Sequence, residues 1–100
     1  MDSHEEVMLK RGDSFVVRLE VPGTSGYLWQ TMENGDEVQV VQIPRSKEEV
    51  ERLPIGAALD QSFRITASAP GETTVIFVLA RPWESDKIVN RHFVSVHIHD

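Results

Sequence analysis

Apolar and polar residues alternate along several short stretches of the chain, and this is the pattern of half-buried β-strands. In the stretch 15–21, Phe15, Val17 and Leu19 share one face, whereas Arg18 and Glu20 lie on the other. Other stretches with strand character are 7–9, 27–31, 38–43, 63–69, 75–79 and 94–98. About seven short strands therefore account for most of the chain.

Two of these stretches carry a more specific expectation. Residues 75–79 are apolar at every position, which predicts a central strand covered on both faces. Phe93 falls outside the alternation of residues 94–98, so we expect a β-bulge beside it.

Turn-forming residues separate the strands, at 10–13, 22–26, 34–36 and 70–72. Pro70 and Gly71 suit the central positions of a type II turn, because proline sets φ and glycine accepts a positive φ. Short strands with regular turns predict an all-β fold, an immunoglobulin-like β-sandwich, in a single domain over residues 1–100. The segment 46–53 begins like a helix, but prolines bracket it, and we interpret it as a charged loop with one helical turn.

Composition narrows the possible partners. The 100 residues include 10 Lys and Arg against 16 Asp and Glu, which gives a net charge of −6. Without a basic stripe, neither nucleic acid nor an anionic membrane is an expected partner. No apolar run approaches the roughly 20 residues of a membrane span. The acidic N-terminus is no signal peptide, so the chain reads as cytoplasmic; removal of a signal would make it periplasmic or secreted.

Catalytic and metal sites are not indicated. The chain has no cysteine, and the glycines around Ser25 lie in neither a phosphate-binding loop nor a nucleophile elbow. His97 and His99 would share one strand face and His92 the other, so a zinc enzyme using these three is a remote alternative. We interpret His97 and His99 as exposed polar residues, and expect no enzyme, metal or cofactor.

Three segments are unusual for solvated turns. Arg81-Pro82-Trp83 follows the most apolar stretch; Pro82 should end that strand, which leaves Trp83 as an exposed anchor or folded over the core edge. The segment 22–26 is small, rich in hydroxyl groups and uncharged, so it is either an ordinary turn or a narrow tip suited to insertion into a cleft. The segment 55–59 is small and apolar between charged stretches, and taken alone it is better interpreted as a buried crossover.

In this order the three segments resemble the motifs of the chagasin family of cysteine-peptidase inhibitors, over roughly residues 16–98. The first motif of that family is Asn-Pro-Thr-Thr-Gly-Tyr/Phe, often followed by x-Trp. Pro22 and Gly23 replace its Asn and Pro. The retained positions, with one hydroxyl exchanged for another at Ser25, are Thr24, Ser25, Gly26, Tyr27 and Trp29.

The other two motifs differ in how well they are kept. Gly-x-Gly-Gly is reduced to Gly56-Ala57-Ala58-Leu59, in which only the first glycine remains. Arg-Pro-Trp is intact as Arg81-Pro82-Trp83. Arg81 either contacts the partner or holds its own loop by hydrogen bonds to carbonyl groups.

The resemblance implies a reversible, non-covalent inhibitor of papain-like cysteine peptidases, monomeric when free, that wedges three loops into the active-site cleft. Residues 23–26 would cover the catalytic cysteine, and the loops of Gly56 and Trp83 would press on the two sides of the cleft. The expected contact residues are Gly23, Thr24, Ser25, Gly26, Tyr27, Gly56, Ala57, Ala58, Leu59, Arg81, Pro82 and Trp83. The alternative is a diverged immunoglobulin-like interaction module without peptidase inhibition, which the altered first and second motifs leave open.

Overall fold

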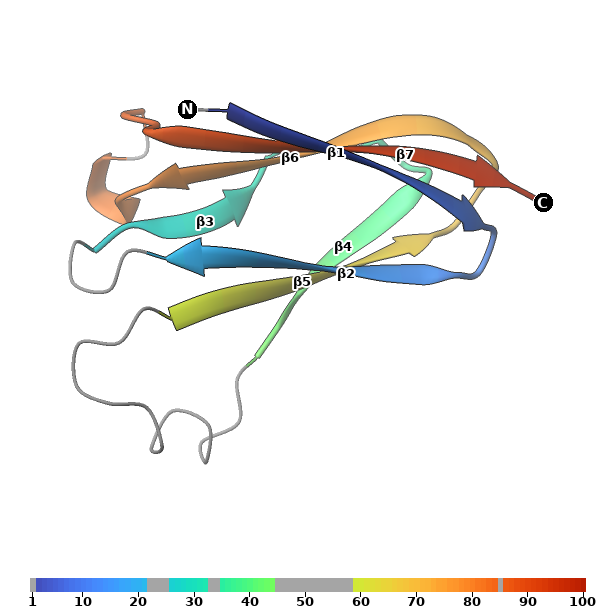
Figure 1. The fold of residues 1–100 in the computed structure, drawn as a ribbon, viewed down its shortest axis with the longest axis horizontal. Coiled ribbons are helices and arrows are strands. Elements are labelled where there is room, and N and C mark those ends of the chain that lie inside the picture. The colour runs from blue at the N-terminus through green and yellow to red at the C-terminus, as the bar shows by residue number, and fades with distance from the viewer. Residues whose placement is uncertain (1, 22–25, 33–34, 45–58, 85) are drawn as a thin grey trace.

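The computed structural model of the chain describes residues 2–21, 26–32, 35–44, 59–84 and 86–100, with Leu59 described by its backbone only. Within these residues seven strands form two sheets that lie one above the other (Figure 1). One sheet has the order β1-β7-β6-β3 and the other the order β2-β5-β4. The strands are β1 (Asp2–Lys10), β2 (Ser14–Val21), β3 (Leu28–Thr31), β4 (Val38–Ile43), β5 (Leu59–Ala67), β6 (Gly71–Ala80) and β7 (Asn90–His99). The predicted all-β, immunoglobulin-like sandwich is confirmed.

The alternation in sequence becomes the division between core and surface. In β2, Val17, Leu19 and Val21 are buried and the residues between them are exposed. Across the two sheets, Phe63 of β5 and Phe77 of β6 meet with ring centroids 4.8 Å apart and planes tilted by 50°. Tilted aromatic pairs of this kind add specific geometry to the burial of apolar area, so they help to fix how the sheets stack.

β6 is an internal strand and is covered as its sequence predicts. Val75, Phe77 and Leu79 belong to the core between the sheets, and Val78 and Ala80 are buried as well although they lie on the opposite face. It pairs with β7 over residues 71–79 and with β3 over residues 77–80, so the backbone of its second half is paired on both sides.

The expected bulge near Phe93 is wrong. The register between β6 and β7 runs without interruption from Gly71 opposite Ile98 to Leu79 opposite Asn90. Phe93 lies opposite Ile76 on the outer face, and the two half-buried side chains stand beside each other. An apolar neighbour on β6, and not an extra residue in β7, accounts for the break in alternation.

β1 is longer than its apolar residues indicated. It pairs in parallel with β7 from Asp2 opposite Arg91 to Lys10 opposite His99, although only Val7 and Leu9 pack on the core. Its polar half is held by backbone pairing, which leaves no periodic signal in the sequence. Gly71 has a positive φ, as expected, but its value of +140° is far from the roughly +80° of a type II turn, and Gly71 is already the first residue of β6.

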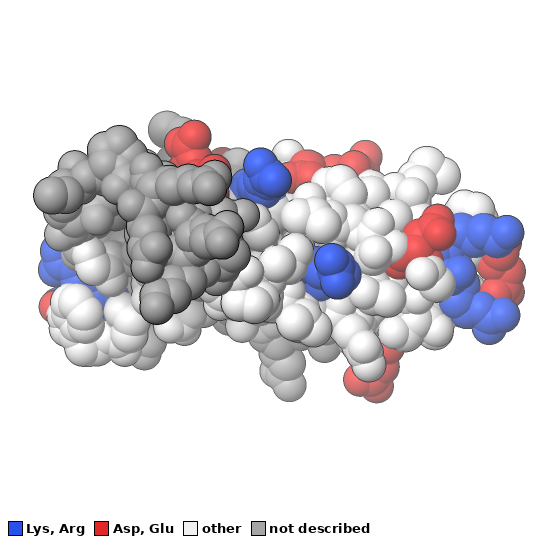
Figure 2. Space-filling model, turned by 90° about the horizontal axis from the view of Figure 1, so that it is seen from below, with Lys and Arg blue, Asp and Glu red and all other residues white. Residues whose placement is uncertain are grey.

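Strand register gathers one set of strand ends at a single pole. Val21 at the end of β2 lies opposite Leu59 at the start of β5, and Leu28 at the start of β3 lies opposite Ala80 at the end of β6. We call this pole the loop end; it lies on the left in Figure 1. The opposite pole carries the turn after β1 and the C-terminus, where Arg11 and Asp100 pair at 3.2 Å, and acidic and basic side chains gather there in Figure 2.

Among the described residues no helix has the length and apolarity that crossing a membrane requires.

Candidate functional site

Trp83 is the most conspicuous residue of the loop end. β6 stops at Ala80, and Pro82 opens the short 3-10 helix η1 (Pro82–Glu84), so Pro82 ends the strand as predicted. The turn is closed by a hydrogen bond from the Glu84 N–H to the Arg81 carbonyl, 2.9 Å long. Trp83 is 70% exposed, which excludes the expectation that its side chain folds over the core edge. Its indole stands at the surface and does not fold over the core.

Although exposed, Trp83 rests on the backbone of Gly26. A Cβ placed on Gly26 would lie 2.7 Å from Cη2 of the indole and 3.4 Å from Cζ2. Gly26 also has φ +79°, a conformation that residues with a side chain rarely adopt. Two independent constraints, the backbone conformation and the contact with Trp83, therefore require glycine at this position.

A second contact joins the same two segments. The guanidinium of Arg81 lies over the ring of Tyr27, with Cζ 4.7 Å from the ring centroid. Tyr27 in turn is partly buried against the core. A cation over an aromatic face contributes about 0.5–1 kcal/mol at an exposed site. The contact of Arg81 with Tyr27 thus links the segment after β6 to the segment before β3.

Beneath these residues, Trp29 ties the two sheets together. Its indole N–H donates to the Glu20 carbonyl on β2 at 2.8 Å, although Trp29 itself belongs to β3 in the other sheet. The side chain is only 8% exposed. Trp29 therefore supports the loop end from inside and does not belong to its surface.

The structure brings together those predicted contact residues that it describes. Gly26, Tyr27, Arg81, Pro82 and Trp83 meet at the loop end, and the backbone of Leu59 enters β5 there beside Val21. The remaining predicted contact residues lie outside the described residues: Gly23, Thr24, Ser25, Gly56, Ala57 and Ala58.

Sequence reasoning missed Gln61. It is 9% exposed and hydrogen-bonds both backbone groups of Trp29. A signal was present, because Gln61 has the same parity as Phe63 and Ile65, the inward residues of β5. A polar residue at an inward position needs an internal partner.

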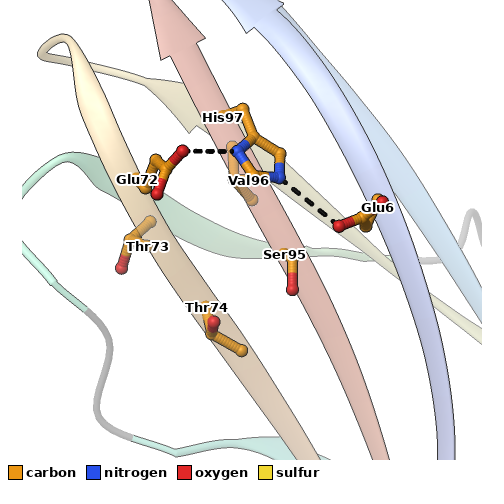
Figure 3. A pocket seen from close by; sticks show the side chains of 7 residues that line it. All are labelled: Glu6, Glu72, Thr73, Thr74, Ser95, Val96 and His97. Atoms are coloured by element: carbon orange, nitrogen blue, oxygen red, sulfur yellow. Dashed lines mark hydrogen bonds and ion pairs between the residues drawn. The ribbon is translucent and has the colours of Figure 1, made fainter.

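The histidines lie elsewhere. His97 is on the outer face of β7, with Nδ1 3.0 Å from Glu72 and Nε2 3.6 Å from Glu6, over a shallow depression (Figure 3). The hydrogen bond to Glu72 raises the pKa of His97 above its usual value, and Glu6 acts in the same direction. His92 is on the opposite face, where Nε2 meets Glu5 at 2.7 Å. Among the described residues no three His, Cys, Asp or Glu side chains are grouped to hold a metal ion.

Comparison with known proteins completes the description. The sequence profile of the chagasin family peptidase inhibitor I42 matches residues 8–98. Among curated protein sequences none matches this chain.

Three solved structures share the fold. PbICP-C, solved in complex with falcipain-2, has a TM-score of 0.78 at 17% identity, covering 99% of this chain and 90% of that one. Amebosin, solved in solution, has a TM-score of 0.72 at 16% identity and covers 98% and 96%. The cysteine protease inhibitor EhICP2 from Entamoeba histolytica has a TM-score of 0.73 at 19% identity and covers 97% and 88%. At these identities the three structures support the fold.

Proposed function

Because this chain belongs to the chagasin family of peptidase inhibitors, we propose that its loop end enters and occludes the active-site cleft of a papain-like cysteine peptidase. Family membership makes the protein an inhibitor and not an enzyme. The kind of peptidase is supported by the structural neighbour that was solved bound to falcipain-2.

The observation that carries the proposal is the state of Trp83 in the free protein. An indole that is 70% exposed offers a partner a large apolar ring with a polar N–H at its edge, which is the kind of surface that interfaces bury. Tryptophan is also the residue type most enriched at the energetic centres of protein interfaces. At the same time its ring lies against Gly26, so its position is set before a partner arrives.

Preformed contacts favour tight binding for a physical reason. Association costs less when side chains and loops are already ordered, because less conformational entropy is lost. The contacts of Trp83 with Gly26 and of Arg81 with Tyr27 order the two segments against each other. Both segments start from strands of one sheet, β3 and β6, which are paired directly below them.

The inhibition we propose needs no bond-forming chemistry. Residues 23–26 carry no charge, so they can enter a narrow cleft without the cost of desolvating an ion. In the bound state they would lie over the catalytic cysteine, with Trp83 on one side of the cleft and residues 56–59 on the other. Substrate is then excluded by volume alone, and inhibition is reversible.

Titration of papain with the purified protein tests the proposal. We expect stoichiometric inhibition with an inhibition constant below about 1 μM, which corresponds to a binding free energy of roughly −8 kcal/mol or better. Circular dichroism on the same sample establishes that the protein is folded. If a folded sample does not inhibit at about 50 μM, roughly fifty times the expected upper limit of the inhibition constant, the proposal is contradicted and a diverged interaction module is favoured.

A further inference from the structure

A buried side chain, Gln61, joins the two sheets by hydrogen bonds beneath the loop end. Among the described residues only Gln61 and His92 are polar and buried, and Gln61 is 9% exposed. A buried primary amide without partners is costly, since its lost hydrogen bonds with water are not replaced. In this protein both ends of the amide have partners, and both partners belong to the same residue of the other sheet.

The side-chain amide of Gln61 makes the two backbone hydrogen bonds to Trp29 that a neighbouring strand would otherwise make. Its Oε1 accepts from the Trp29 N–H at 2.7 Å, and its Nε2 donates to the Trp29 carbonyl at 3.1 Å. β3 is an edge strand, and directly after it the Met32 N–H donates to the Ile76 carbonyl of β6. Ladder bonds of an antiparallel pair involve alternate residues, so the backbone groups of Trp29 point to the open side. Gln61 satisfies these two groups on the side of β3 where the described part of the chain has no further strand.

The hydrogen bonds between Gln61 and Trp29 lie close to the strand ends that carry the predicted contact residues. Gln61 comes two residues after the start of β5, and Trp29 comes two residues after Tyr27. Trp29 also reaches Glu20, one residue before the end of β2, through its indole N–H. We call the three hydrogen bonds among Gln61, Trp29 and Glu20 the clasp. The clasp lies directly under the strand ends that carry the predicted contact residues.

We propose that the clasp positions the binding surface: Gln61 sets the sheet that carries Tyr27 and Trp83 relative to the strand that begins at Leu59. Among the described strands no backbone ladder joins the two sheets, since each sheet has its own strand order. Both sheets contribute strand ends to the loop end. The binding surface therefore keeps its shape only if the distance between the two sheets stays fixed at the loop end. Gln61 is a positioning residue, because it is buried and reaches the surface only through other residues. This inference rests on the proposed function.

The test compares Gln61→Met with a control at the opposite pole. Methionine nearly keeps the volume and removes both hydrogen bonds. The control is Ile98→Val or Ile98→Ala, whichever lowers the melting temperature to the same extent, because Ile98 is buried at the far end of β7. If Gln61→Met does not fold, Gln61→Glu takes its place, since it keeps the shape and one acceptor.

We expect Gln61→Met to weaken papain inhibition about tenfold, and mainly by lowering the association rate constant. A surface that is correctly arranged in only a tenth of the molecules binds with a tenfold higher apparent dissociation constant. The stability-matched Ile98 variant should stay within about twofold of the wild type. Equal inhibition constants for the Gln61 variant and the wild type would overturn the inference, as would equal losses in the Gln61 and Ile98 variants.

A second measurement separates failure of the clasp from failure of the proposed function. Amide hydrogen exchange at Gly26, Tyr27 and Trp83 needs no peptidase, and these amides should exchange faster in Gln61→Met than in the Ile98 variant. If the wild type does not inhibit papain but exchange follows this order, the clasp stands and the proposed function falls. Unchanged exchange at the three amides overturns the clasp whatever the inhibition data are.

Discussion

The indole of Trp83 and the Cα of Gly26 are in direct contact, so close that a single methyl group on Gly26 would lie 2.7 Å from the ring. Two motifs that are more than fifty residues apart in sequence are thereby joined into one surface. The contact explains how a tryptophan can be both exposed and ordered. Because of this contact, replacing Gly26 with a larger residue should displace the side chain of Trp83.

Gly26→Ala should weaken peptidase inhibition by about tenfold or more. Alanine strains the backbone at φ +79° and displaces the indole, and a loss of about 1.4 kcal/mol in binding is already a factor of ten. The matched control is Gly12→Ala. Gly12 has φ +95° but no atom within 4 Å of the added Cβ, and it lies at the opposite pole. Both variants should melt at a lower temperature; only Gly26→Ala should inhibit less. Equal inhibition by the two would show that the Trp83 contact is irrelevant to binding.

Trp83→Ala should weaken inhibition at least tenfold and leave stability nearly unchanged. Truncation of an interface anchor costs about 2–4 kcal/mol of binding, whereas a side chain that is 70% exposed contributes little to the core. Met8→Ala serves as the control, because Met8 is 76% exposed on β1 and lies outside the loop end. Inhibition constants and melting curves for the two variants check this prediction. An inhibition constant that does not change in Trp83→Ala would remove Trp83 from the contact surface.

Stability should depend on pH through His97. Glu72 and Glu6 raise its pKa in the folded protein above the usual 6.5, so folding favours the protonated imidazole. The stabilisation is complete below pH 6.5 and disappears as the pH rises through the folded-state pKa. The exposed setting keeps the effect small.

Melting curves from pH 5.5 to 8.5 measure this effect. The difference in melting temperature between the wild type and His97→Gln should be largest at the acidic end and vanish at the basic end. His99→Gln is the control, because the ring of His99 contacts only the Asp100 carbonyl among the hydrogen bonds described for it. A difference that grows with rising pH would contradict the assignment.

Alternation was sufficient to predict those strands that bury one face. In β2 the parity of Val17, Leu19 and Val21 is the parity of burial, whereas the stretch 38–43 was found from its β-branched residues and coincides with β4. It did not predict the polar half of β1, because residues 2–6 are held by backbone pairing with β7. Neither did it explain Phe93, whose outward position depends on Ile76 in another strand.

The site was predictable only in part, and for a similar reason. Arg81-Pro82-Trp83 could be found as an unusual run of residues, and Pro82 ends the strand as a local property of proline. The contact of Trp83 with Gly26 and the hydrogen bonds of Gln61 with Trp29 join segments that are far apart in the sequence. Such contacts follow from strand register, and register is set by the packing of the whole sandwich.

The central claim is that the loop end covers the catalytic cysteine of a papain-like peptidase without reacting with it. The most direct measurement is the rate at which a small alkylating reagent modifies that cysteine in papain, with and without one equivalent of the inhibitor. We predict that the complex protects the cysteine, that protection is weakened in Trp83→Ala, and that full peptidase activity returns once the complex dissociates. Alkylation at the same rate in the presence of the folded wild-type protein, at concentrations that block cleavage of substrate, would contradict the account.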